Sequence, residues 1–227
     1  MAVPIATNTS TPYMSINDNT LTLVQLLSAS FPVGAFAYSH GLEAVIDDGE
    51  IKNAQDLEGW LHSLLTHGSA RADAVLLNVV FAADDSEIEM IDASARAFAT
   101  SKERLKETDL QGAAFCETVS NVWGLDPSPL TYPVAVGHTA RLMELDAELT
   151  TAMYLQAFVG NLCAVAMRLV PLGQTDGQRV QIALKHVCLK VAAEVQGATL
   201  DDLHSSTFLS DIASMRHETQ YSRIFRT

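Results

Sequence analysis

The sequence predicts an all-α protein, a single-domain bundle of about ten helices. Apolar residues recur at intervals of three and four along most of the chain, as they do on the buried face of an amphipathic helix. We find no convincing run of alternating β-branched residues, the pattern of a half-buried strand. The 227 residues are enough for one substantial hydrophobic core, and no repeat of fixed period indicates a solenoid.

The first part of the chain predicts a leader followed by helices. Residues 1–20 have neither the charged region nor the apolar run of a signal peptide, so we expect a polar, disordered leader. Residues 21–27 open a short apolar helix that ends near SFPVG. We interpret AFAYSHGLEAVID (35–47) as a second helix. Residues 53–83 continue as amphipathic helices with a break near THGSARAD.

The later part of the chain predicts five further helices. Residues 87–99 and 102–123 keep the helical pattern, the latter with a charged, exposed KERLKETD in its first half. The loop GLDPSPLTYP contains three prolines and interrupts the pattern. The most hydrophobic third of the chain then forms helices over residues 132–145, 147–170 and 178–195.

The segment PLGQTDGQ joins the last two of these helices. It lacks the lysine and the spacing of a nucleotide-binding loop, so we interpret it as an interhelical turn. We expect Pro171 to end one helix, Gly173 to supply an unusual backbone angle, and Thr175 or Asp176 to cap the next helix. The structural loop is assigned to Pro171, Gly173, Gln174, Asp176 and Gly177.

Composition limits the classes of partner. The formal net charge of −13 argues against a nucleic-acid-binding surface, which would gather Lys and Arg. Hydrophobic residues make up 48% of the chain and charged residues only 18%, which favours a protein that assembles with others. Polar residues interrupt the most membrane-like run, residues 153–170, so we interpret it as a buried central helix and expect no membrane. We expect a cytoplasmic protein.

The residues that could carry chemistry do not form a recognisable catalytic or metal motif. No two of the seven histidines lie three or four residues apart, so we predict no metal site and no tightly bound cofactor. Ser39, His40 and Glu43 are close in sequence, but neighbours on a helix point in different directions and cannot form a triad among themselves. We predict no catalytic residue. We expect reduced core thiols at Cys116, Cys163 and Cys188.

Two stretches are candidates for partner contact. FPVGAFAYSHGLE is either a rigid docking surface or a tightly packed helix corner, and its candidate residues are Pro32, Gly34, Tyr38, Ser39, Gly41 and Glu43. The end of the chain, MRHETQYSRIFRT, places three of the 14 cationic residues within the last twelve positions. We expect a flexible partner-binding tail over residues 215–227, after a helical domain over residues 21–214.

The candidate residues of this tail are Arg216, Glu218, Tyr221, Ser222, Arg223, Phe225 and Arg226. Tyr221 and Phe225 are expected to anchor a partner, while Arg223 pairs with a carboxylate or a backbone carbonyl. The alternative is a last helical turn that folds back on the protein itself.

The stretches FPVGAFAYSHGLE, TYPVAVGH, RLVPLGQTDGQR and DIASMRHETQYSRIFRT together resemble the urease accessory protein F (UreF) family, in order from about Leu23 onward. The resemblance implies an all-α, homodimeric, non-enzymatic chaperone of urease maturation. Its implied partners are UreD (also called UreH), the GTPase UreG and apo-urease, into which nickel is inserted. The family's C-terminal segment becomes ordered on binding UreD, which would make the tail an interface.

Two other functions stay open from the sequence. The protein could regulate GTP hydrolysis by UreG, with Arg223 or Glu43 acting near the catalytic water and either activating or restraining it. An unrelated helical enzyme is the other alternative, although no nucleophile or cofactor motif supports it. Nickel that passes through the protein is expected to make only transient oxygen or water contacts.

Overall fold

The computed structural model describes residues 18–125 and 127–227, and within these residues it contains ten α-helices, three short 3-10 turns and no strand. This confirms the predicted all-α class. The first five helices are α1 (Asp18–Leu26), α2 (Leu42–Asp47), α3 (Ala54–His67), α4 (Ser69–Ala82) and α5 (Ile88–Ala97). The remaining five are α6 (Lys102–Trp123), α7 (Tyr132–Leu142), α8 (Ala147–Leu169), α9 (Gln174–Glu194) and α10 (Phe208–His217).

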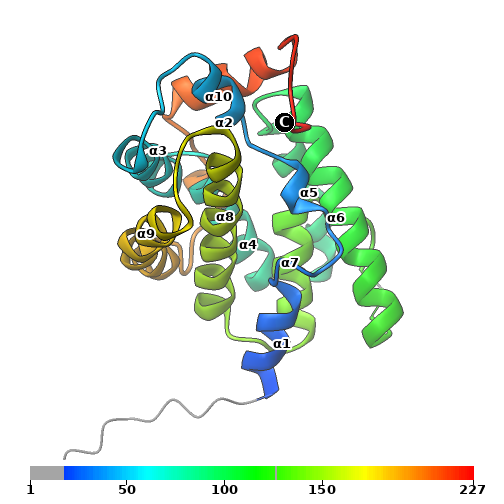
Figure 1. The fold of residues 1–227 in the computed structure, drawn as a ribbon. Helices are drawn as coiled ribbons and strands as arrows, with labels where there is room; N and C mark the ends of the chain where they lie inside the picture. The colour runs from blue at the N-terminus through cyan, green and yellow to red at the C-terminus, as the bar shows by residue number, and fades with distance from the viewer. Residues whose placement is uncertain (1–17, 126) are drawn as a thin grey trace, which may run out of the picture.

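Helix α8 stands at the centre of the bundle. It contacts α9 most extensively and also packs against α4 and α2, while α7 lies between α4 and α6. Figure 1 shows α9 and α3 on one side of α8 and α6 and α7 on the other. Helices α2 and α10 cross the end of the bundle opposite α1.

The apolar composition of α8 is explained by this position. The helix is long and apolar enough to cross a membrane, but more than half of its apolar stretch is buried inside the bundle. Its buried side chains, among them Leu155, Phe158, Val159 and Leu162, belong to the hydrophobic core. The structure therefore places it as the buried central helix that the sequence predicts.

The predicted second helix is wrong in its first half. Residues Ala35–Ala37 form a short 3-10 turn, and α2 begins only at Leu42. His40 and Gly41 lie between them with positive φ angles of 54° and 77°, which no continuous right-handed helix accommodates. A Cβ atom at Gly41 would lie 2.7 Å from the backbone nitrogen of Ser214, so α10 approaches this turn too closely for any other residue.

The turn before α9 also differs from the prediction. Gly173 precedes the helix with an ordinary φ of −72°, and no side chain caps the helix start. Gln174, Asp176 and Gly177 lie in the first turn of α9, and Asp176 pairs with Arg179 instead of with orphan amides. The predicted backbone angle and the predicted cap are therefore both wrong, although Pro171 does follow the end of α8.

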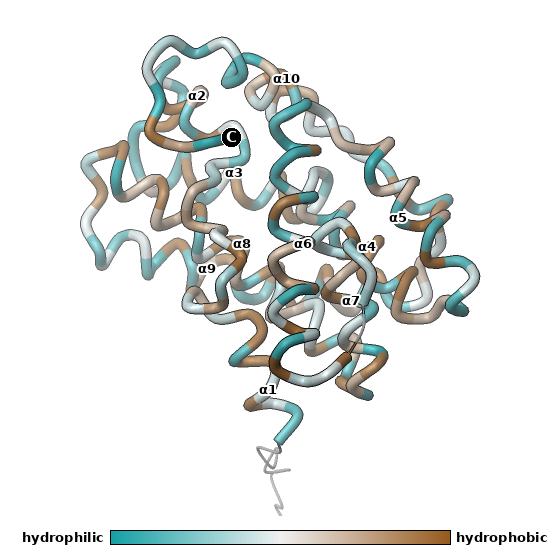
Figure 2. The backbone as a smooth tube through the Cα atoms, turned by 90° about the vertical axis from the view of Figure 1, so that its right-hand side faces the viewer, coloured by the Kyte–Doolittle hydropathy of each residue, from teal (hydrophilic) through white to brown (hydrophobic). Residues whose placement is uncertain are grey.

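The two ends of the chain were predicted to be mobile. The expected leader lies almost wholly outside the described residues, except that residues 18–20 open α1. We expected a flexible tail over residues 215–227, and the structure corrects this expectation. Residues 215–217 belong to α10, and the chain beyond them is hydrogen-bonded to the bundle. In Figures 1 and 2 the end of the chain lies beside α2, at the end of the bundle that carries α10.

Candidate partner-binding site

The C-terminal segment, residues 218–227, runs along the turn that precedes α2. The backbone amide of Ser39 donates to the carbonyl of Thr227 at 2.8 Å, and the amide of Arg226 donates to the carbonyl of Ala37 at 2.8 Å. The Ser39 hydroxyl also donates to the Thr227 carbonyl. The two sequence stretches that were separate candidates are thus brought together into one unit.

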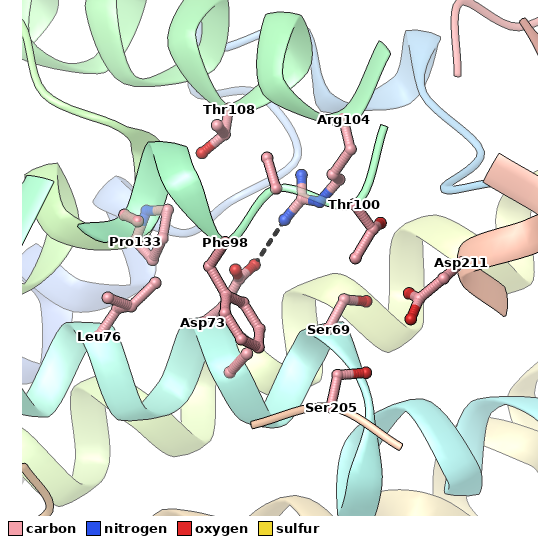
Figure 3. Close-up of a pocket in the computed structure, with 13 residues that line it drawn as sticks. Ser69, Asp73, Leu76, Phe98, Thr100, Arg104, Thr108, Pro133, Ser205 and Asp211 are labelled. Carbon is pink, nitrogen blue, oxygen red and sulfur yellow. Dashed lines mark hydrogen bonds and ion pairs between the residues drawn. The ribbon is translucent and has the colours of Figure 1, made fainter. Parts of the chain in front are cut away.

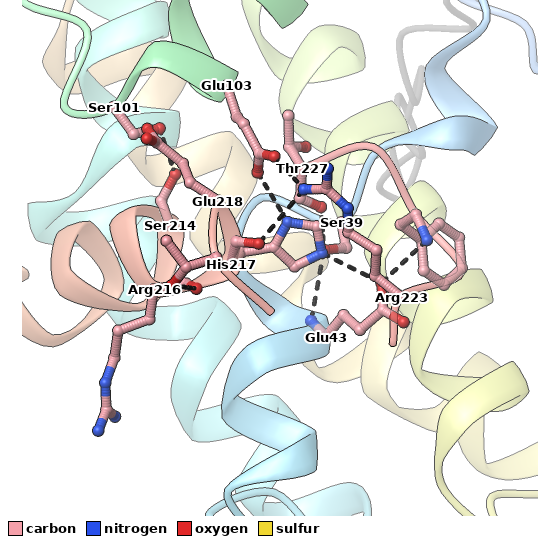
Figure 4. A network of polar contacts seen from close by, with 12 residues as sticks. Ser39, Glu43, Ser101, Glu103, Ser214, Arg216, His217, Glu218, Arg223 and Thr227 are labelled. Carbon is pink, nitrogen blue, oxygen red and sulfur yellow. Dashed lines mark hydrogen bonds and ion pairs between the residues drawn. The ribbon is translucent and has the colours of Figure 1, made fainter. Parts of the chain in front are cut away.

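Glu43 is the main acceptor for the segment. Its carboxylate, on a residue that is only 5% exposed, accepts from the amide of Ile224 at 2.7 Å and from the amide of Phe225 at 2.9 Å. Its Oε2 atom also lies 3.1 Å from Nε2 of His217. Hydrogen bonds to a buried carboxylate are charge-assisted and strong. Glu43 therefore fixes the backbone of the segment, as Figure 4 shows.

His217 and Glu103 extend this network to α6. The other ring nitrogen of His217, Nδ1, lies 2.7 Å from Oε2 of Glu103. Arg223 pairs with the same Glu103 carboxylate and donates to the backbone carbonyl of His217 at 3.3 Å. The expected pairing of Arg223 with a carboxylate or a carbonyl is therefore made within the chain itself.

Glu107 holds the last residue of the sequence. Its fully buried carboxylate accepts from the Thr227 hydroxyl at 2.9 Å and lies 2.8 Å from Nε2 of His40 and 3.3 Å from Arg104. Burial by itself would raise the pKa of Glu107. The charges of His40 and Arg104 and the hydrogen bonds from His40 and Thr227 outweigh burial and lower the pKa to about 2. Glu107 is therefore an ionised acceptor in the interior.

Arg104 links this network to α4 through Asp73, 2.8 Å away, which also accepts from the Tyr154 hydroxyl at 2.9 Å. Burial acts to lower the pKa of Arg104, but the neighbouring carboxylates raise it above its usual value. The pocket beside this pair, shown in Figure 3 with Thr108 and Asp211 on its wall, has a volume of about 40 Å³. Such a volume holds a water molecule and not a substrate.

An exposed apolar surface lies on α10 and the segment. Its side chains on α10 occupy one helical face, and two more follow on the segment: Phe208, Leu209, Ile212, Met215, Tyr221 and Ile224. Leu209 is 75% exposed and Tyr221 is fully exposed. Exposed apolar side chains in a row along one helical face are typical of an interaction site. We call these six residues the α10 surface.

The structure separates the two expected aromatic anchors. Tyr221 points into solvent, whereas Phe225 is buried against its own bundle, with the Arg168 guanidinium 5.9 Å from its ring centre. Arg216 pairs with Asp48, and Glu218 accepts from the Lys102 amide at 2.8 Å. Ser222 and Arg226 have exposed side chains.

The candidates before α2 lie mostly inside the protein. Tyr38, Ser39, Gly41 and Glu43 are buried. Pro32 is exposed and Gly34 is partly so, beside an exposed Phe36. Phe36 borders a cleft of about 690 Å³ between α1, residues 33–36 and α8. Ser39, His40 and Glu43 do not form a triad, because the His40 ring faces Glu107 and the Ser39 hydroxyl donates to Thr227.

Sequence reasoning missed Glu103, Arg104, Glu107 and His217. The charged stretch KERLKETD was expected to be exposed, but Glu107 is fully buried because His40, Arg104 and Thr227 surround its carboxylate. The only local signal was the spacing of four between Glu103 and Glu107, which places both on one face of α6. Their partners come from distant segments that no local pattern identifies.

The sequence also carried predictions for the cysteine thiols and for the side chains that could bind a metal ion. All three cysteines are buried and free, as predicted, and burial raises the pKa of Cys163 to about 12 and that of Cys188 to about 11. Within the part of the chain that the structure describes, no three His, Cys, Asp or Glu side chains cluster in a way that could hold a metal ion.

Comparisons with known proteins agree on one family. Residues 51–185 match the family model described as UreF. The chain is 50% identical over 210 residues to the urease accessory protein UreF of Roseobacter denitrificans, covering 92% of this chain and 95% of the relative. It is 46% identical over 208 residues to that of Ruegeria pomeroyi, covering 91% and 96%. These relatives carry the name of an accessory protein and not of an enzyme. The chain belongs to the UreF family of urease accessory proteins.

Proposed function

We propose that this protein is a non-catalytic chaperone of urease maturation, which binds UreD (UreH) and bridges it to the GTPase UreG on apo-urease while nickel is inserted. The names of the relatives support the link to urease. The observation that carries the proposal is the α10 surface, a row of exposed apolar side chains that no element among residues 18–125 and 127–227 covers. We propose that this surface binds UreD.

The α10 surface has the chemistry of a stable interface. Burying a large apolar side chain stabilises a complex by about 1.5–3 kcal/mol before association costs are subtracted. Tyrosine is one of the residue types that most often dominates binding, and Tyr221 offers a whole exposed ring. Because the segment is already held by Glu43, binding at this surface avoids part of the cost of ordering it.

The network also bears on the second candidate function. In the docked segment Arg223 is paired with Glu103, and Glu43 is buried beneath the backbone of residues 224 and 225. Neither side chain is free to reach the nucleotide of a partner in the way that an arginine finger must. The geometry thus favours an adaptor over a direct regulator of GTP hydrolysis.

Further properties of the complex belong to the same proposal. Nickel is cargo, and we propose that it meets only transient oxygen and water contacts on its way to urease. We propose a homodimer, for which the cleft beside Phe36 offers apolar surface. The protein acts in the cytoplasm.

A binding experiment with matched surface variants tests the proposal. Leu209→Glu places a charge at the centre of the α10 surface, and Ile182→Glu places one at a similarly exposed position on α9. We expect Leu209→Glu to weaken UreD capture at least about tenfold, because a buried unpaired charge costs more than 1.4 kcal/mol. Ile182→Glu should bind as the unchanged protein does. Equal capture by both variants, each folded by circular dichroism, would sink the proposed role of this surface.

A further inference from the structure

Two histidines beside the C-terminal segment have different surroundings, and the side chain of His40 is 9% exposed while that of His217 is fully buried. His217 is fully buried, with Nδ1 2.7 Å from Glu103 and Nε2 3.1 Å from Glu43. His40 has only Nε2 beside a carboxylate, 2.8 Å from Glu107, while its buried Nδ1 has no hydrogen-bond partner. One ring therefore faces two acceptors and the other faces one.

Counting donors assigns a protonation state to His217. A neutral imidazole has one N–H, an imidazolium has two, and an ionised carboxylate can only accept. For His40 a single N–H on Nε2 satisfies its one carboxylate contact, so the count does not decide the charge of that ring. A neutral His217 would leave one unprotonated ring nitrogen against a carboxylate oxygen, so only its imidazolium satisfies both contacts.

The second proton belongs on the ring and not on a carboxylate, because an imidazole is ordinarily about 2 pKa units more basic than a carboxyl group. Both oxygens of Glu43 accept from backbone amides, those of Ile224 and Phe225, which favours its ionised form. Glu103 faces His217 with Oε2 and pairs with the fixed charge of Arg223 through Oε1, which also favours the ionised form.

The charges around His217 balance only when the ring is charged. Glu43 from α2 and Glu103 from α6 face the ring, and Arg223 from the segment is the only other cation in the cluster. The charged residues on either side of His217 in the sequence are engaged elsewhere, Arg216 with Asp48 and Glu218 with the Lys102 amide. Figure 4 shows Arg216 pointing away from the ring. With an imidazolium, two positive charges meet two negative charges in a buried site.

We propose that His217 is a protonation switch for the C-terminal segment. As an imidazolium it positions the Glu43 carboxylate to hold the amides of Ile224 and Phe225, and on losing a proton it lets the segment detach. The proton leaves Nδ1 or Nε2 for solvent, and the cluster is left with one uncompensated negative charge. His217 is a positioning residue, since it acts on the segment through Glu43. The consequence for a partner, weaker UreD binding when the ring is neutral, rests on the function proposed above.

The test uses the full chain without any partner, so its outcome does not depend on UreD. Nitrogen-15 NMR of the imidazoles distinguishes an imidazolium from a neutral tautomer, and amide exchange at Ile224 and Phe225 reports segment docking. We expect His217 to be an imidazolium while the segment is docked. As the His217 signal becomes neutral with rising pH, the protection factors of the two amides should fall roughly tenfold or more.

Two variants separate the switch from a structural role. In Glu103→Gln the amide can donate to Nδ1 of a neutral His217, and Glu43 then balances Arg223, so protection should no longer vary with pH. His186→Gln, on the exposed side of α9, should keep the unchanged protein's pH profile. A neutral His217 with protected amides, or protection that stays constant through its titration, would overturn the proposal whatever the variants do. Failure of UreD to bind while this profile is observed would count against the proposed function and not against the switch.

Discussion

The carboxylate of Glu43 accepts a hydrogen bond from the backbone amide of Phe225, 182 residues later in the chain, at 2.9 Å. This contact joins the motif before α2 to the end of the sequence, two stretches that look like separate interaction sites when read alone. The buried carboxylate holds the segment to the bundle, while the side chains of the α10 surface are exposed to solvent. The C-terminal segment is thus part of the fold as well as a candidate interface.

Removing the Glu43 carboxylate should release the segment. Glu43→Ala takes away the acceptor for two amides and leaves His217 with one carboxylate, and hydrogen bonds to charged groups contribute about 1.5–3 kcal/mol each. We expect trypsin to cut after Arg223 at least about tenfold faster than in the unchanged protein. Asp47→Asn, at an exposed carboxylate of the same helix, is the control and should leave the rate unchanged. Unaltered cleavage of Glu43→Ala would contradict the role given to this carboxylate.

Gly41 should be the least replaceable glycine of the junction. Gly41→Ala combines a left-handed backbone, with φ 77°, and a Cβ 2.7 Å from the Ser214 nitrogen, so we expect a loss of about 2 kcal/mol or more in the free energy of unfolding. Gly124→Ala has a similar φ of 69° but open space around its Cβ, and should lose only about 1 kcal/mol. Denaturant unfolding measures both values. Equal losses would mean that the approach of α10 relaxes without cost.

Acid should lower the folding stability of the protein, because Glu107 becomes protonated. The pKa of this carboxyl falls from an ordinary 4.5 to about 2 in the folded state, because His40, Arg104 and Thr227 outweigh the effect of burial. Between those values the unfolded state binds more protons, so stability is lost as the pH falls through this window. The stability difference between the unchanged protein and Glu107→Gln should therefore shrink from pH 4.5 toward pH 2. Thermal unfolding across this range measures it, and a constant difference would show that Glu107 does not titrate as stated.

The two aromatic residues of the segment should behave differently. Phe225 is 4% exposed, and truncating a buried Phe costs about 3–5 kcal/mol in a core, so Phe225→Ala should detach the segment while the helical body stays folded. Tyr221→Ala should leave the segment docked, because its ring contacts solvent. Mass-spectrometric amide exchange of the C-terminal peptide separates the outcomes. Release of the segment by Tyr221→Ala would show that the ring has a docking role that its exposure does not reveal.

The predictable parts of the fold are those fixed by local chemistry. Helix α6 begins and ends as predicted because Ser101 caps its start and Gly124 ends it in a left-handed conformation. The predicted break between α3 and α4 falls at Gly68, whose backbone is extended, with φ −119° and ψ −155°. Where a distant element decides the backbone, as α10 does at Gly41, the local helical pattern gave the wrong answer.

The candidate site was predictable only in part. The aromatic and cationic residues of the last thirteen positions drew attention to the right segment, but not to its docking on the bundle. Burial of Glu107 could not be read from the charged stretch around it, since its partners His40 and Thr227 lie 67 and 120 residues away. The exposed apolar face of α10 was not predicted, because a sequence does not say which apolar face lacks a covering element.

Hydroxyl-radical footprinting with and without UreD tests the central claim most directly, since it reads the solvent exposure of individual side chains. The α10 surface supplies three reactive probes, Phe208, Met215 and Tyr221, and Met90 on α5 is a similarly exposed reference. If this surface binds UreD, oxidation of all three should fall several-fold on adding UreD while oxidation of Met90 stays unchanged. Oxidation of the three probes that is unaffected by bound UreD would contradict the account.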